Sequence, residues 1–168
     1  MNKTDYKKEL KQFYSSKQGA FETIIVPKMN FLMIDGGNGP ASQDWMDAVM
    51  TLYPVAYAIK FICKKELQKD FVVMPLEGLW WMDDMSKFSE AVKDDWLWSG
   101  MIMQPDVVTN DIFEKAINQL KAKDKLPPAL DNIRFESYEE GRSAQVLHVG
   151  PYTEEGPIIQ KLHNFIEE

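Results

Sequence analysis

The sequence predicts an α+β fold made of two related halves, and two observations lead to this prediction. Short apolar runs typical of strands are interleaved with stretches in which apolar residues recur every three or four positions, as they do in helices. The order strand, glycine-containing turn, helix then occurs twice, at Phe31–Tyr53 and at Val146–Ile166. A chain of 168 residues suits one domain or two small fused modules. We expect the modules at about 21–105 and 106–168.

Six segments rich in β-branched and aromatic residues, bounded by Gly, Pro or Asp, predict strands. They are Phe21–Val26, Met29–Asp35, Phe71–Leu76 continuing through Glu77–Trp81, Trp96–Gln104, Arg134–Tyr138 and Ala144–Val149. Gly78 is expected to form a bulge in the third of these, because glycine inside a strand often marks one. The last two strands are expected to pair as a hairpin around Glu140-Gly141.

Four amphipathic segments predict helices. They are residues 3–18 (a short helix or a docked arm), the segment from Ala41 to Cys63, the segment from Thr109 and Asn110 to about Lys123, and a last helix after Gly150-Pro151-Tyr152. Pro54 is expected to kink or split the second helix, since proline removes a backbone donor and clashes with the preceding turn. The apolar face of the last helix needs a cover, either the sheet of the first half or a hairpin beyond Glu168.

Aromatic residues are the unusual part of the composition. They make up 12% of the chain, and four of the five tryptophans fall within nineteen residues, at Trp80, Trp81, Trp96 and Trp98. A buried indole needs a partner for its N–H group. Four indoles this close together are more than one core layer readily accommodates, so we expect some of the rings to line a cleft.

Charge and composition argue against several classes of partner. A net charge of −7 repels a phosphate backbone, so direct nucleic-acid binding is not expected. The sequence shows no apolar run of the roughly 18 residues that a membrane span needs and no signal-like start, so neither a membrane nor export is expected. The single cysteine, Cys63, lies on an apolar helix face and is expected to be an inert buried thiol. These features predict a cytoplasmic protein.

Familiar catalytic and cofactor motifs are missing from the sequence. There is no phosphate-binding loop or dinucleotide fingerprint, and Gly36–Pro40 is expected to be a structural turn. Only His148 and His163 are available as imidazole ligands, so no metal site is expected, and no cofactor is predicted. There is also no Gly-x-Ser-x-Gly elbow for a serine nucleophile.

Several segments nevertheless resemble one family, the stand-alone GyrI-like small-molecule-binding proteins. The most specific are Pro75–Trp81 with its Glu-Gly-x-Trp-Trp pattern and His148–Tyr152 with its His-x-Gly-Pro-Tyr pattern, and Trp96–Asp106 resembles the family more weakly. The resemblance implies two strand–helix–strand–strand (SHS2-like) modules related by a pseudo-two-fold axis. Their strands would form a concave antiparallel sheet backed by helices, with the ligand in the groove between the modules. Chains of this family usually continue past the last helix with a hairpin containing His and Glu, whereas this sequence stops at Glu168.

The resemblance also implies a function. The family includes effector domains of multidrug-responsive transcription factors and a gyrase-inhibiting protein. The Glu-Gly-x-Trp-Trp pattern is most similar to a subfamily that looks like hydrolases of cyclopropane-bearing DNA alkylators. We therefore expect binding of small, flat, largely apolar or cationic xenobiotic-like molecules, as a stand-alone sensor or protective protein. The alternatives are hydrolysis of the cyclopropane ring and a protein-interaction role of the gyrase-inhibitor type. The oligomeric state is not predicted.

The candidate site residues combine rings, thioethers and one carboxylate. The expected ligand-binding residues are Trp80, Trp81, Trp98, Tyr138, Tyr152, Tyr57, Met101 and His148. Trp80 and Trp81 are neighbours on a strand and must point to opposite faces, so we expect one of them to reach the ligand together with Trp98. Glu77 is the candidate catalytic group, which would orient a water molecule, unless it is exposed or paired with a lysine. The alternative for the tryptophans, Tyr57, Met101 and His148 is packing in the core, which is the preferred interpretation for His148.

Overall fold

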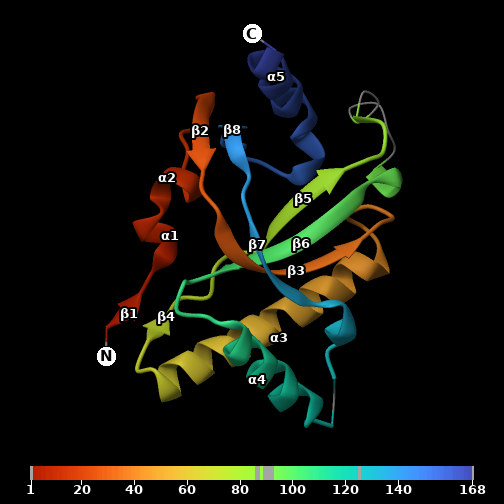
Figure 1. The fold of residues 1–168 in the computed structure, drawn as a ribbon. Helices are drawn as coiled ribbons and strands as arrows, with labels where there is room; N and C mark the ends of the chain where they lie inside the picture. Colours follow the sequence, from red (N-terminus) through yellow and green to blue (C-terminus); the bar gives the residue numbers. More distant parts are fainter. Residues whose placement is uncertain (1, 86–87, 89–92, 125, 168) are drawn as a thin grey trace. The chain divides into compact units, whose positions relative to one another are not determined.

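The computed structural model describes residues 2–85, 88, 93–124 and 126–167, and the chain forms two compact units (Figure 1). Unit 1 comprises Met1–Tyr6 and Met29–Tyr138, and unit 2 comprises Lys7–Lys28 and Glu139–Glu168. Both units are built mostly from antiparallel strands and helices, which confirms the α+β class. The two units do not divide at residue 106, where the boundary between the modules was expected. Unit 1 continues to Tyr138 and so includes the helix and the strand that follow residue 106.

Unit 1 contains a four-stranded antiparallel sheet. Its strands stand in the order β5 (Glu77–Trp81), β6 (Leu97–Gln104), β3 (Met29–Gly36) and β7 (Arg134–Tyr138). All four coincide closely with predicted strands. The predicted bulge at Gly78 is wrong, since Gly78 lies in regular register opposite Gly100. The reason for a glycine here is packing, as described below for Trp45.

The longest element is α3 (Gln43–Glu66), which packs against β3 and β6. Ser42 caps it by accepting a hydrogen bond from the Trp45 amide at 3.1 Å. Pro54 lies inside the helix, which continues through it, so of the predicted kink or split the split does not occur. Leu52 and Val55, on either side of the proline, are fully buried, and this packing offsets the local cost of about 3 kcal/mol.

Among the described helices, α3 alone is long and apolar enough to cross a bilayer. Leu52, Val55 and Ile59 of α3 are fully buried, the helix packs against β3 and β6, and half of its most apolar window is buried. We therefore interpret α3 as the core helix of unit 1.

A second helix, α4 (Asn110–Lys121), packs against α3 and confirms the prediction for this segment. Thr109 caps it by accepting from the Ile112 amide at 3.4 Å. Phe113 stacks on Phe135 of β7, with 6.0 Å between ring centroids. Both helices thus cover the same face of the sheet (Figure 1). A short 3-10 turn, η3 (Leu130–Asn132), then leads into β7.

One predicted strand is much shorter than expected. Of Phe71–Leu76, only β4 (Asp70–Phe71) is formed, and it pairs in parallel with β1 (Lys3–Thr4). The Leu76 amide bonds instead to the Tyr53 hydroxyl at 3.3 Å, and Pro75 has no amide hydrogen to contribute to a ladder. The segment thus leaves the strand pairing after the Val72 amide, which donates to the Thr4 carbonyl of β1 at 2.8 Å, and its last amide is bound by α3.

Unit 2 is smaller. The segment predicted as a short helix or a docked arm gives two single turns, α1 (Tyr6–Glu9) at the unit boundary and α2 (Lys11–Tyr14). The remaining elements are β2 (Glu22–Val26), β8 (Gly141–Gln145), the 3-10 turn η4 (Tyr152–Glu154) and α5 (Gly156–Glu167). The predicted hairpin is wrong, because β8 pairs with β2 whereas β7 pairs with β3. Phe21 contacts Phe165 of α5, at 5.7 Å between ring centroids.

Candidate functional site

The strand register sorts the side chains of the unit 1 sheet onto two faces. Gly78 and Gly100 lie opposite each other, and a Cβ atom on either would stand 3.2 Å from the Trp45 ring of α3. These two glycines therefore mark the face covered by the helices. Successive residues of a strand alternate between faces, so Trp80 lies on the helix face and Trp81 on the opposite one. We call the face opposite α3 and α4 the distal face.

The tryptophans of the helix face form an aromatic cluster. Trp45 lies at its centre, with ring centroids 4.7 Å from Trp80 and 5.0 Å from Trp98. Trp96 extends the cluster, since its ring lies 6.1 Å from Trp80 and is stacked on Phe88 at 4.3 Å. The concentration of tryptophans in the sequence is thus explained largely by a shared core. Trp45 was missed as a candidate, although its position on the apolar stripe of α3 indicated it.

Trp98 is placed by two neighbouring glycines. Its indole Nε1 donates to the Gly37 carbonyl at 2.9 Å, and its ring occupies the space where a Gly36 side chain would stand. Only 1% of Trp98 is exposed. Trp98 was expected to contact the ligand, but its ring packs in the core and presents almost no surface to a ligand.

The distal face carries an apolar surface with a carboxylate at one end. We call the residues Glu77, Leu79, Trp81 and Leu97 the distal patch; all four are half-buried. Trp81 stands opposite Leu97, Leu79 opposite Ser99, and Glu77 opposite Met101. Four residues along a strand span about 14 Å, so Trp81 and Glu77 mark the two ends of a surface as long as a flat ring system of two or three fused rings.

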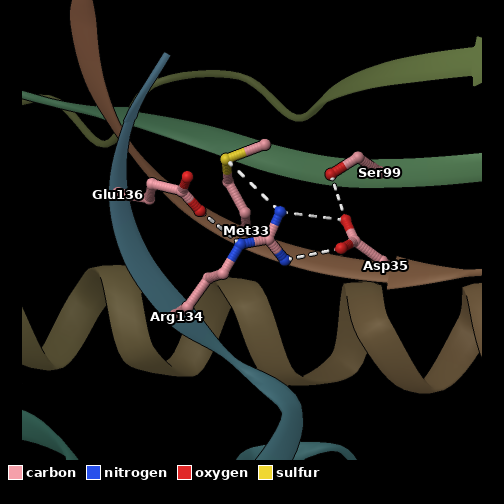
Figure 2. A network of polar contacts seen from close by, with 5 residues as sticks. All are labelled: Met33, Asp35, Ser99, Arg134 and Glu136. Carbon is pink, nitrogen blue, oxygen red and sulfur yellow. Dashed lines mark hydrogen bonds and ion pairs between the residues drawn. The ribbon is translucent and has the colours of Figure 1, made fainter.

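A polar network lies beside the distal patch, around Asp35 at the end of β3 (Figure 2). The Asp35 carboxylate accepts from the Ser99 hydroxyl at 2.6 Å and forms a two-pronged pair with Arg134, at 2.9 and 3.1 Å. Arg134 Nε also donates to Glu136 at 2.6 Å. Ser99 is buried and stands opposite both Leu79 and Asp35, so the network continues directly from the patch.

The network is electrostatically held. Partial burial alone would lower the pKa of Arg134, but hydrogen bonds to Glu136 and Asp35 outweigh it and raise that pKa. With two carboxylates and one guanidinium, the network has a net charge of −1. The sequence analysis did not identify this network. Its one indication was Asp35, a charged residue that ends an apolar run just before Gly36.

Of the remaining candidates in unit 1, Met101 lies beside the distal patch, whereas Tyr138 and Tyr57 do not. Tyr138 shares the distal face, but it pairs with Met29, four residues along β3 from the row of Glu77 and Met101, or about 14 Å. Its strand, β7, also lies three strands away from β5 in the sheet. Met101 stands directly opposite Glu77 on the distal face, next to the patch, but its side chain is buried. Tyr57 lies on an exposed side of α3 and stacks on Phe61.

His148 and Tyr152 belong to unit 2. One ring nitrogen of His148, Nε2, lies 3.1 Å from the Pro151 carbonyl, and Tyr152 is largely exposed. Within the described ranges, no three His, Cys, Asp or Glu side chains gather as they would around a metal ion. Cys63 is buried in unit 1, and burial raises the pKa of its thiol, which agrees with an inert structural role.

Comparison with solved structures gives strong matches over nearly the whole chain. A hydrolase from Listeria innocua is 38% identical, with a TM-score of 0.82, and the match covers 98% of this chain and 84% of the hydrolase. An uncharacterized conserved protein from the same organism is 39% identical, with a TM-score of 0.83 and coverages of 98% and 81%. No model of a protein family matches the chain, and no curated protein does.

Proposed function

Since this chain belongs to the same family as these Listeria innocua proteins, we propose that it is a hydrolase of small, flat, largely apolar molecules. The observation that carries the proposal is its 38% identity with a hydrolase along 98% of its length. The resemblance to GyrI-like proteins with paired SHS2-like modules belongs to the same proposal, and it supplies the substrate class. That class is the cyclopropane-bearing DNA alkylators, so the enzyme would be a protective protein of the cytoplasm.

The distal patch is the site we propose for the substrate. Trp81, Leu79 and Leu97 offer ring and aliphatic surface against which a flat molecule can stack, and its burial supplies the binding energy. Glu77 provides a carboxylate at the edge of this surface. The polar network holds β7, β3 and β6 together alongside, which keeps the patch in place.

The chemistry requires little of the protein. Water attacks the methylene carbon of the cyclopropane, and the strained carbon–carbon bond breaks. Its electron pair moves through the conjugated system to the carbonyl oxygen, which takes up a proton and becomes a phenol. Overall, one molecule of water is added. We propose that Glu77 orients the attacking water and accepts its proton, a role that general bases fill with rate effects of about 10²–10⁴.

The first test is turnover of a duocarmycin-type cyclopropane, followed by liquid chromatography with mass detection of the hydrated product. We expect many turnovers per protein. Glu77→Gln should lower kcat by roughly 10²-fold or more, because glutamine cannot accept the proton. Trp81→Ala should mainly raise KM, since it removes stacking surface. Glu114→Gln, an exposed carboxylate on α4, is the matched control and should leave both constants unchanged.

Two results would refute parts of the proposal. Binding of the compound in equilibrium dialysis without turnover would make the protein a binder, a function that the apolar distal patch also fits. A folded protein that neither binds nor hydrolyses the compound would reject this substrate class. It would direct attention to the protein-interaction alternative.

A further inference from the structure

The outward face of α3 carries an apolar stripe. Its residues are Met46 (53% exposed), Met50 (54%), Tyr57 (48%) and Phe61 (58%), with half-buried Pro54 between them. They follow one another at intervals of three or four residues, so they form one continuous line on the helix. Met46 and Phe61 are fifteen residue steps apart along the helix, so the stripe is about 22 Å long. Tyr57 and Phe61 stack on each other within it, at 6.5 Å between centroids.

We infer that this stripe is a self-association surface, on which α3 of a second copy packs in the antiparallel direction. The first argument is the order of residue types. Thioethers occupy one end and aromatic rings the other, so reversing the second helix brings methionine onto aromatic rings, a favourable contact. A parallel arrangement would instead place methionine on methionine and ring on ring.

The second argument is charge. Asp47 flanks the methionine end of the stripe, and Lys65 flanks the aromatic end. An antiparallel pair brings each carboxylate toward the lysine of the other copy, on both sides of the two-fold axis. It also sets the two helix dipoles in opposite directions. Because each copy supplies the same surface, the contact closes on itself as a symmetric dimer.

A lipid surface fits the stripe less well. Interfacial helices carry basic residues along the polar flank, which attract anionic headgroups. Here one end of the stripe is acidic, and the whole chain carries a net charge of −7. A stripe with one acidic and one basic end is complementary in charge to the same stripe of a second, antiparallel copy. It is less complementary to a membrane surface that carries one sign of charge.

The size of the stripe sets the expected strength. Four half-exposed large side chains present on the order of 400 Å², taking about 100 Å² each. A stable dimer buries roughly 800 Å² per subunit, so flanking groups must supply the remainder. We therefore expect a weak, concentration-dependent dimer with a Kd on the order of 10 μM.

Sedimentation velocity from about 1 μM to about 500 μM, at low and high salt, tests this proposal. The wild-type mass should rise from 19.4 kDa toward twice that value, and less so in high salt. Met50→Glu should raise Kd by at least about tenfold, because the dimer would have to bury a charge. Leu126→Glu makes the same change at an exposed leucine outside the stripe, and it should associate like the wild type.

A charge exchange separates this helix pair from other modes of association. Asp47→Lys alone should weaken the dimer, and Asp47→Lys combined with Lys65→Asp should restore it. Circular dichroism would check that each variant is folded. A wild type that stays monomeric throughout would overturn the proposal, as would equal effects of Met50→Glu and Leu126→Glu. Binding to phosphatidylcholine vesicles that is lost in Met50→Glu, without self-association, would also overturn it in favour of a membrane surface.

Discussion

At the scale of single residues, glycines determine how the tryptophans of unit 1 pack. Gly78 and Gly100 make room for Trp45, and Gly36 makes room for Trp98. A Cβ atom at position 36 would stand 2.2 Å from the Trp98 ring, far inside any tolerable contact. Trp98 is buried and held by its bond to the Gly37 carbonyl, so it cannot move aside without losing that bond. Space, rather than backbone freedom, thus explains the glycine at this position.

Gly36→Ala should therefore destabilise unit 1 by about 3 kcal/mol, at the upper end of what overpacking usually costs. Gly37→Ala is the matched control, because its Cβ would meet only Leu97, at an ordinary 3.5 Å. We expect the control to stay within about 0.5 kcal/mol of the wild type. Urea unfolding of the three proteins measures both effects. Equal stabilities of the two variants would contradict the packing argument.

The site residues show what could be predicted at this scale. The placement of Trp80 and Trp81 on opposite faces follows from strand geometry, and the register confirms it. The network of Asp35, Ser99 and Arg134 could not be predicted, because its members are 64 and 99 residues apart in sequence. Only the pairing of three strands brings them together, and hydrophobic periodicity does not specify partners.

At the scale of elements, the Thr51 hydroxyl of α3 forms a hydrogen bond with the loop before β7. Thr51 is fully buried, donates to the Asp47 carbonyl at 2.8 Å and accepts from the Ala129 amide at 3.0 Å. The amide of Ala129 has this hydroxyl as its partner. Loss of the hydroxyl would leave a backbone donor without one.

Thr51→Val should consequently lower the free energy of unfolding by about 1–3 kcal/mol, although the two side chains have nearly the same shape. Thr51→Ser keeps both hydrogen bonds and loses one methyl group, so it should cost only about 0.8 kcal/mol. Thermal unfolding monitored by circular dichroism compares the two. A valine variant as stable as the serine variant would show that the Ala129 amide finds another partner.

Two ion pairs between α3 and β4 also hold elements together, and their contribution to stability depends on pH. Asp70 accepts from Lys60 at 2.8 Å and pairs with Lys64 at 2.9 Å, and these two bonds lower its pKa from 3.8 to about 2. Because the pKa is lower in the folded state than in the unfolded state, this carboxylate stabilises the fold above pH 4. That contribution is lost as the pH falls from about 4 to about 2.

Asp70→Asn should therefore be less stable than the wild type at pH 7, where the wild-type carboxylate is charged. The difference should shrink between pH 4 and pH 2. Urea unfolding across this range provides the measurement, and a difference that stays constant down to pH 2 would argue against the ion pairs. Lys60 is buried in the folded protein, so its loss of a partner adds to the effect at neutral pH.

Elements were easier to predict from the sequence than their partners. The apolar runs identified β2, β3, β6, β7 and α4 closely, because burial imposes the period of each element on the sequence. The hairpin, the bulge at Gly78 and the split at Pro54 were wrong. In each case long-range packing prevailed over a local signal: β8 pairs with β2, Trp45 fills the space at Gly78, and a buried helix continues through Pro54.

At the scale of the whole molecule, the two units differ in how much they bury. Unit 1 holds a four-stranded sheet under two helices, whereas among the described residues of unit 2 only Val26 is buried. None of the described residues of α5 is buried. Backbone amides of β2 and β8 should thus exchange with deuterium on the order of a hundredfold faster than those of β3 and β6. Mass spectrometry of peptides tests this, and equal protection of the two sheets would contradict it.

The placement of the indoles has a spectroscopic consequence. All five tryptophans, at positions 45, 80, 81, 96 and 98, belong to unit 1, and unit 2 contains only Tyr14 and Tyr152 as emitters. Tryptophan emission on unfolding would report unit 1 alone, while far-ultraviolet circular dichroism reports the backbone of both units. The ring centroids of Trp80 and Trp98 lie 4.7 and 5.0 Å from that of Trp45, near enough for the excited states of the rings to couple. The near-ultraviolet circular dichroism spectrum should therefore report whether the tryptophan core of unit 1 is packed.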